Sequence, residues 1–411
     1  MQMDIGALEN IYLLNLGVTR RERVLVFTDK VSPKKEGPLP PLELERRAGL
    51  LEIGRAAALA GRGLAKEIIY RQYAATGAPA VEPPKTLWAA AFGAGCVAAL
   101  SSRGLLKEII NKRVSAEGLG EAGRIIRRHK RDAVDAVMAL SNYSTTHTIF
   151  RKLLTGAGAR YASMPLFDAG MLSGPMNVDY GELKRLTSAV ARAIRGADWL
   201  EITAGNGTRL LLRKGGRRAR QDNGDYRKPG AAGNLPAGEV YLAPLEGTAS
   251  GRLVLEWAPT RKLKSPVTLL VSRGVVTEVL GKEPFAEELR GRLAACPECA
   301  NIAELGIGTN KLAKRPDNIL ESEKILGTVH VALGDNHTFG GRVKAPFHQD
   351  FVFFRPTLAA IAGDKKGVIM RKGIWMAGVL PPPRKTSFPG TPVSDKNVSD
   401  KNLPAGSGGG P

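Results

Sequence analysis

The C-terminal half of the chain contains TVHVALGDNHTFGG at residues 328–341 and FHQDFVFF at residues 347–354. Both include short apolar runs, rich in Val and Phe and close to Gly, Asn or Pro, a pattern that predicts buried β-strands. Side chains two residues apart lie on the same face of a strand. His348 and Asp350 are therefore expected to project together, one imidazole beside one carboxylate.

The same strand-and-turn pattern extends back to Gly196. We expect strands at residues 199–203, 208–212 and 239–243, a hairpin at residues 267–280 that turns near Arg273, and a helix at residues 284–295. This change of pattern places a domain boundary near residue 196.

The N-terminal half has the alternating pattern of an α/β fold. Residues 23–28 (RVLVFT) predict a buried strand, residues 42–140 are mostly helical, and residues 180–195 predict a helix. RGLAKEII at residues 62–69 returns as RGLLKEII at residues 103–110, which we interpret as two similar helices. The predicted organisation is an N-terminal α/β domain (1–195), a mixed α+β metal-binding catalytic domain (196–380) and a disordered tail (381–411).

The net charge of +21 raises the question of nucleic-acid binding. The basic clusters at residues 124–131 and 213–220 contain no interleaved aromatic residues, and aromatic residues make up only 6% of the chain. Stacking platforms for bases therefore look absent, and no nucleic-acid partner is expected. The longest apolar run, at residues 87–100, is too short to span a bilayer, so no membrane partner is expected either.

The chain has three cysteines, an odd number that argues against a disulfide scaffold. A reducing, cytoplasmic setting is the simplest interpretation. Cys296 and Cys299 have the spacing of half a zinc-binding motif, but two unligated thiols are the simpler alternative.

Histidines and acids gather in one segment of the predicted C-terminal domain. Three of the five histidines, His330, His337 and His348, lie close together in the sequence. Glu304 is a lone acid among apolar residues in AELGIGTN at residues 303–310, and a buried acid needs a partner such as a metal ion. Imidazole and carboxylate ligands suit zinc, manganese or non-haem iron. The segment from Glu304 to Asp350 therefore predicts a metal site.

Several longer motifs resemble one known family. They are STTHT at residues 144–148, GEVYLAP at residues 238–244, NIAELGIGTN at residues 301–310, GTVHVALGDNHTFGG at residues 327–341 and HQD at residues 348–350. With these motifs the chain resembles the thermophilic metallo-aminopeptidases of the aminopeptidase T type. The resemblance implies a two-domain α/β protein, a homodimer, a peptide substrate and a dinuclear site in the C-terminal domain.

The same resemblance assigns roles to individual residues. It implies that the metal ligands are Glu239, Glu304, His330, His348 and Asp350. Two divalent ions, zinc or cobalt, would activate a water molecule for hydrolysis of the N-terminal peptide bond. Glu304 and His337 are the implied catalytic residues, and His337 stands where the family has a tyrosine.

Two other classes of function remain open. The chain also looks like a distant relative of the ring-cleaving dihydroxypyridine dioxygenases, which bind a single iron through two histidines and one aspartate. His330, His348 and Asp350 would form that triad, and Glu239 and Glu304 would then be bystanders. The third class is a basic nucleic-acid-binding protein without enzymatic activity.

Overall fold

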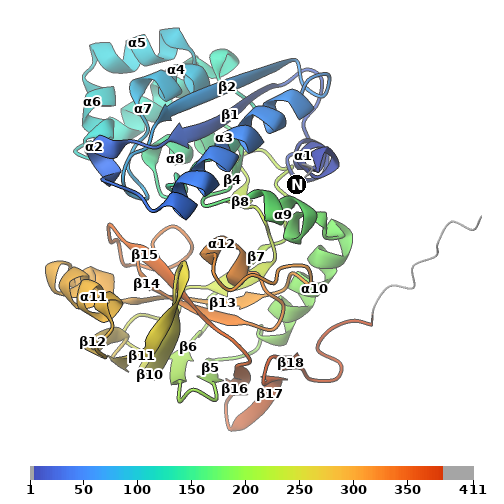
Figure 1. The fold of residues 1–411 in the computed structure, drawn as a ribbon, viewed down its shortest axis with the longest axis vertical. Helices are drawn as coiled ribbons and strands as arrows, with labels where there is room; N and C mark the ends of the chain where they lie inside the picture. Colours follow the sequence, from blue (N-terminus) through green and yellow to red (C-terminus); the bar gives the residue numbers. More distant parts are fainter. Residues whose placement is uncertain (1–3, 383–411) are drawn as a thin grey trace, which may run out of the picture. The chain divides into compact units, whose positions relative to one another are not determined.

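The computed structural model describes residues 4–382 and confirms the predicted α/β fold class, with three sheets and the helices packed on them (Figure 1). The chain up to Pro381 forms one compact unit. The boundary near residue 196 stays a prediction. The predicted disordered tail, residues 381–411, lies outside the described residues from residue 383 onward.

The N-terminal half is built on a parallel sheet with the strand order β2-β1-β3-β4-β8. Its strands are β1 (Arg23–Lys30), β2 (Glu67–Ala74), β3 (Ala136–Leu140), β4 (Arg160–Ser163) and β8 (Ala232–Asn234). Val24 and Val26 of β1 pack with α3 (Pro41–Ala60), while Leu25 and Phe27 pack with α4 (Lys85–Phe92) and α8 (Ile149–Gly156). Both faces of the sheet are therefore covered, as a parallel sheet requires.

The remaining helices are α1 (Ile5–Asn10), a π-helical turn (Ile11–Asn15), α2 (Pro33–Glu36), α5 (Ala94–Ser102), α6 (Leu105–Ile110), α7 (Ala116–Arg128), α9 (Ala169–Ser173), α10 (Tyr180–Ala193), α11 (Pro284–Ala295) and α12 (Ile319–Ser322). Among them, α7, α10 and α11 have three turns or more and the others are shorter. Single 3-10 turns cover Lys130–Asp132, Pro175–Asn177 and Pro297–Ala300. The helices predicted at residues 180–195 and 284–295 are confirmed as α10 and α11.

The prediction of two similar helices from the repeated KEII sequence is wrong. The second copy lies in α6, but the first enters β2, which pairs in parallel with β1 along its whole length. Tyr73 of β2 is buried, with its ring centroid 6.0 Å from that of Phe27. Pairing with β1 and burial of the aromatic residues that follow the repeat outweigh the local helical pattern, because tertiary context overrides propensity.

The C-terminal half contains two antiparallel sheets. The larger has the order β12-β11-β10-β6-β5-β16-β17-β18 and the smaller the order β15-β14-β13-β9-β7. The strands are β5 (Trp199–Thr203), β6 (Arg209–Arg213), β7 (Arg220–Asp222), β9 (Glu239–Leu242), β10 (Ser250–Ala258), β11 (Arg261–Ser272), β12 (Val275–Leu280), β13 (Ile302–Gly308), β14 (Val329–Gly334), β15 (His348–Phe353), β16 (Thr357–Ala362), β17 (Lys365–Arg371) and β18 (Ile374–Trp375). The strands and the hairpin predicted in this half are confirmed.

Two smaller features bear on the sequence predictions. Cys296 and Cys299 form a disulfide, so neither the zinc-binding interpretation nor the alternative of two free thiols holds. The remaining cysteine, Cys96, is buried and free. Among the helices of residues 4–382, none has both the length and the apolar character needed to cross a membrane.

Candidate metal centre

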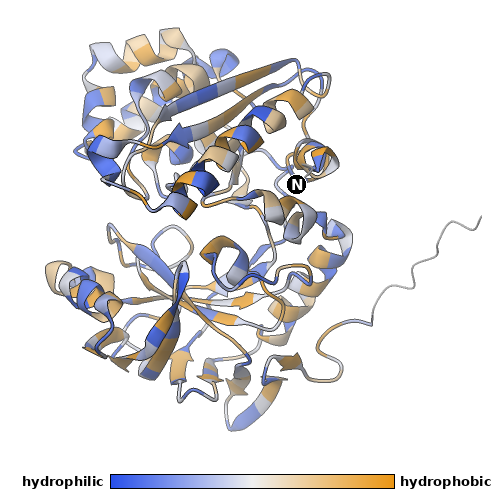
Figure 2. Ribbon diagram, in the orientation of Figure 1, coloured by the Kyte–Doolittle hydropathy of each residue, from blue (hydrophilic) through white to orange (hydrophobic). Residues whose placement is uncertain are grey.

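The smaller antiparallel sheet has one apolar and one polar face. Its strands alternate between the two, because successive side chains of a strand point to opposite sides. The apolar side chains belong to the main hydrophobic core of the C-terminal half; they are Val240, Leu242, Leu305, Ile307, Val329, Val331, Leu333, Phe351 and Phe353. The intervening positions carry acids and imidazoles: Asp222, Glu239, Glu304, His330, His348 and Asp350. Figure 2 shows β15 as hydrophilic at one end and hydrophobic at the other.

Strand register brings the polar residues together. His330 of β14 pairs with Gly306 of β13, and Asp350 of β15 pairs with Ala332, the residue opposite Glu304. An irregularity between Ile302 and Glu304 shifts the register of β13 just before the site. Such bulges re-aim side chains, and they are frequent beside functional sites.

Gly306 makes room for the His330 ring. A Cβ atom at Gly306 would lie 1.9 Å from Nε2 of His330, far inside contact distance. The imidazole therefore lies across the glycine and reaches the carboxylates of the neighbouring strands. Nε2 of His330 is 3.2 Å from Oε2 of Glu239 and 3.4 Å from Oε1 of Glu304.

The second imidazole lies on the other side of Glu304. Nε2 of His348 is 3.6 Å from Oε2 of Glu304 and 3.6 Å from Oδ1 of Asp350. The backbone oxygen of Asp335 is 2.8 Å from Nδ1 of His348, which fixes the orientation of the ring. All five residues predicted as metal ligands thus gather on one face, with Glu304 between the two imidazoles.

The ligand atoms fall into three overlapping groups in which all atoms lie within 4.8 Å of one another. They are Glu239, Glu304 and His330; Glu304, His348 and Asp350; and Glu323, His330 and Asp350. Each group offers one imidazole and two carboxylates, a donor set suited to divalent transition metals. The prediction of a metal site is therefore supported in its general form.

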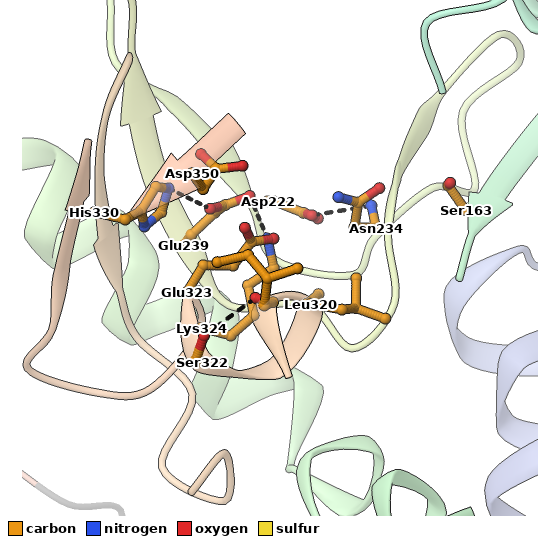
Figure 3. Close-up of polar contacts among 12 residues, drawn as sticks. Ser163, Asp222, Asn234, Glu239, Leu320, Ser322, Glu323, Lys324, His330 and Asp350 are labelled. Atoms are coloured by element: carbon orange, nitrogen blue, oxygen red, sulfur yellow. Dashed lines mark hydrogen bonds and ion pairs between the residues drawn. The ribbon is translucent and has the colours of Figure 1, made fainter. Parts of the chain in front are cut away.

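Sequence reasoning missed two residues of this site: Glu323, which belongs to the third group, and Lys324 beside it. Lys324, fully buried, places Nζ 2.5 Å from Oε1 of Glu239 and 2.7 Å from Oε1 of Glu323. Figure 3 shows His330 and Lys324 approaching the Glu239 carboxylate from different sides. Both missed residues follow α12 in the polar segment ESEK, whose composition is typical of a surface turn, so nothing in the sequence marked them as buried.

The site carries more negative than positive charge. Five buried or half-buried carboxylates face Lys324 and two imidazoles; these acids are Asp222, Glu239, Glu304, Glu323 and Asp350. Burial acts to lower the pKa of His348, but the charges of Asp350 and Glu304 outweigh it and raise the pKa to about 10. Burial raises the pKa of Glu323 to about 8, with Lys324 opposing the shift. A divalent cation would balance the remaining charge.

A cavity of about 410 Å³ lies over the polar face. Glu304, His348 and Asp350 line it, whereas His330 is only 1% exposed and is not part of the lining. The lining also includes residues of the N-terminal half: Thr146 and His147 after β3, Arg151 of α8, Ser163 at the end of β4, and Leu166. The cavity is thus bounded by both halves of the chain.

Two further histidines lie close to the ligands. The ring of His147 stacks on that of His348, with 5.5 Å between centroids and 26° between planes. Burial, and then the charge of His348, lowers the pKa of His147 to about 4. His337, predicted as catalytic, belongs to none of the three ligand groups; its Nδ1 lies 2.6 Å from Oδ1 of Asp335, and its side chain is 40% exposed. The structure therefore places His337 at the edge of the site, in contact with Asp335.

Comparisons with known proteins find relatives with two different activities. A family model described as 2,5-dihydroxypyridine 5,6-dioxygenase (NicX) matches residues 176–371, just under half of the chain. No curated protein sequence matches the chain. The structure is similar to 2,5-dihydroxypyridine dioxygenase from Pseudomonas putida KT2440, with a TM-score of 0.62, 18% identity, and coverage of 91% of this chain and 96% of that one.

The structure of this chain is also similar to wild-type AmpT from Thermus thermophilus, with a TM-score of 0.54, 13% identity, and coverage of 90% of this chain and 98% of that one. At these identities the two structures share the fold with this chain, and a shared fold does not fix function. The matching family model describes an oxidoreductase, so the predicted hydrolase and protease activity and the peptide substrate are wrong. The homodimer stays a prediction.

Proposed function

We propose that this chain is a metal-dependent dioxygenase that opens a hydroxylated pyridine ring with one non-haem iron ion. The observation that carries the proposal is the dioxygenase family match, because residues 176–371 include every acid and imidazole of the metal centre. The cavity over these ligands supports it, since small-ligand sites are commonly concave and of this size.

Glu304, His348 and Asp350 are the proposed iron ligands. They form one of the three groups and all line the cavity, so an ion held by them would face a bound ring. His330, behind them, holds Glu239 and Glu304 in place. This set differs from the triad of His330, His348 and Asp350 expected from sequence, because those three do not form one of the groups. Bound iron would supply the redox chemistry that activates O2.

The chain's own residues would bind the ring and form a hydrogen bond with its hydroxyl group. Phe339 and Tyr241 line the cavity with ring centroids 5.7 Å apart, and they offer apolar surface to a planar ligand. His147 lines the same cavity and is neutral at pH 7, because its pKa lies near 4. Its neutral imidazole could accept a hydrogen bond from a ring hydroxyl group.

In the proposed reaction one ring C–C bond breaks and both atoms of O2 enter the product, so no external reductant is needed. The test is oxygen uptake with 2,5-dihydroxypyridine by protein stripped of metal and reloaded with iron(II) or zinc(II). We expect one O2 consumed per ring opened with iron and none with zinc. His348→Ala should abolish uptake, and Glu278→Gln, an exposed acid on β12, should not change it. No uptake by iron-loaded, folded protein would overturn the proposal.

A further inference from the structure

Arg151 is a half-buried cation on the cavity wall, and no acid within residues 4–382 forms an ion pair with it. It lies in the first turn of α8, and its Nε donates a hydrogen bond to the backbone oxygen of Thr146 at 2.7 Å. Among residues 4–382, neither of its terminal guanidinium nitrogens forms a hydrogen bond or an ion pair. The guanidinium group lines the cavity, and its two terminal nitrogens have donors left over for an anionic ligand.

Comparable arginines elsewhere in the chain are paired. Arg160 lies 2.7 Å from Glu22, and Arg47 lies 2.7 Å from Glu36. Arg217 on the C-terminal half forms a bidentate pair with Glu246. The chain therefore provides acids for its buried guanidinium groups in general, and Arg151 departs from that rule where it borders the cavity.

A second arginine lines the same cavity. Arg220, the first residue of β7, is exposed and has no acidic partner within ion-pair distance in the described part of the chain. Tyr241 also lines the cavity and is the register partner of Arg220 across β7 and β9, and its phenol interacts electrostatically with both arginines. The cavity thus has an acidic, metal-binding side and a cationic side.

Thr146 and His147 connect the two sides of the cavity. Arg151 is held on the carbonyl of Thr146, the residue before His147, and the His147 ring stacks on the ligand His348 at 5.5 Å between centroids. A planar ring beside His147 could place an oxygen substituent toward the ligands and another substituent toward the guanidinium group. A guanidinium fork matches a carboxylate with two parallel hydrogen bonds.

We infer that the cavity selects a hydroxylated aromatic ring that also carries a carboxylate group, with Arg151 as its main binding partner and Arg220 as a supporting charge. The substrate is accordingly a hydroxypyridine carboxylic acid in preference to an uncharged dihydroxypyridine. This inference rests on the proposed function for the reaction, while the anion site itself rests on the two arginines.

Binding of two matched probes tests the inference. 6-Hydroxypyridine-3-carboxylate and 6-hydroxypyridine-3-carboxamide have almost the same shape and differ in charge. Their dissociation constants are measured by calorimetry with iron-loaded protein under argon, so no turnover interferes. We expect the carboxylate to bind about tenfold to hundredfold more tightly, the usual range for hydrogen bonds to charged groups. Arg151→Gln should reduce this ratio to within about threefold, and Arg151→Lys should keep part of it.

Arg55→Gln, an exposed arginine on α3, is the matched control and should keep the full ratio. Thermal unfolding establishes that each variant is folded. Equal affinity for the two probes in the wild-type protein, or an unchanged ratio in folded Arg151→Gln, would overturn the inference. Oxygen uptake, measured both with 2,5-dihydroxypyridine and with a dihydroxypyridine carboxylic acid, separates this result from the proposed function. Uptake without carboxylate preference contradicts the anion site alone, and carboxylate preference without uptake on either compound contradicts only the dioxygenase.

Discussion

The two faces of the sheet β15-β14-β13-β9-β7 use the same strands for opposite purposes. One face packs into the core through residues such as Val331 and Phe351, which are almost completely buried. The other gathers carboxylates, imidazoles and one buried lysine beneath the cavity. The apolar face stabilises the fold by removing hydrocarbon from water, whereas the polar face buries charges at a cost in free energy. Buried charges of this kind are typical of functional sites, where they bind a ligand or a metal ion.

The comparison predicts that the two faces fail in different ways. Substitutions on the apolar face should lower stability and leave metal affinity unchanged in the folded protein. Substitutions on the polar face should change metal affinity, and they should change stability only where a charge loses its partner. Three experiments separate these outcomes.

The largest expected effect comes from Lys324→Met. This change leaves Glu239 and Glu323 buried without their shared cation, and removal of one partner from a buried ion pair typically costs about 3–5 kcal/mol. The free energy of unfolding is measured with urea in metal-free protein, and Lys262→Met on an exposed position of β11 serves as control. A loss of less than about 1 kcal/mol would mean that Lys324 is not the counter-ion of this cluster.

The next effect concerns Gly306→Ala. The added Cβ would meet the His330 ring, so the imidazole must move away from Glu239 and Glu304. We expect metal affinity to fall about 10- to 100-fold, as it does when residues that orient metal ligands are changed.

Gly291→Ala in α11, where a Cβ meets no neighbour, is the matched glycine control. Val331→Ala on the apolar face of β14 should lower stability without this loss of affinity. Equal metal affinity in Gly306→Ala and wild-type protein would break the assignment of His330 to the site.

The third effect is the pH dependence of metal binding. Without metal, the raised pKa of His348, about 10, keeps its imidazole protonated at neutral pH, so an incoming ion must displace that proton. Affinity should therefore rise with pH, about tenfold per unit between pH 6 and 8 for each proton released. Titration with zinc at three pH values measures the slope, and a flat profile would contradict the ligand role of His348.

Much of the fold could be predicted from local pattern, because strands with one buried face show it in sequence. FHQDFVFF predicted both a strand and the shared face of His348 and Asp350, and the structure has both. β2 was missed because its pairing with β1, over forty residues away, outweighs a helical pattern in its first residues. Long-range pairing of this kind leaves no local signal.

The residues of the site also differ in whether the local sequence marks them. Glu304 and the two histidines were visible as polar residues within apolar strands, whereas Glu239 was identified only through family resemblance. Glu323 and Lys324 lie in a segment with surface composition, and only the fold buries them. The activity could not be predicted from the ligands alone, because one fold carries both an aminopeptidase and a dioxygenase.

Incorporation of labelled oxygen tests the proposed dioxygenase most directly. Iron-loaded protein is supplied with 2,5-dihydroxypyridine under ¹⁸O2 in ordinary water, and the ring-opened product is examined by mass spectrometry. The account predicts that both atoms of one O2 molecule appear in the product. A product without ¹⁸O, with its new oxygen atoms taken from water, would contradict the account.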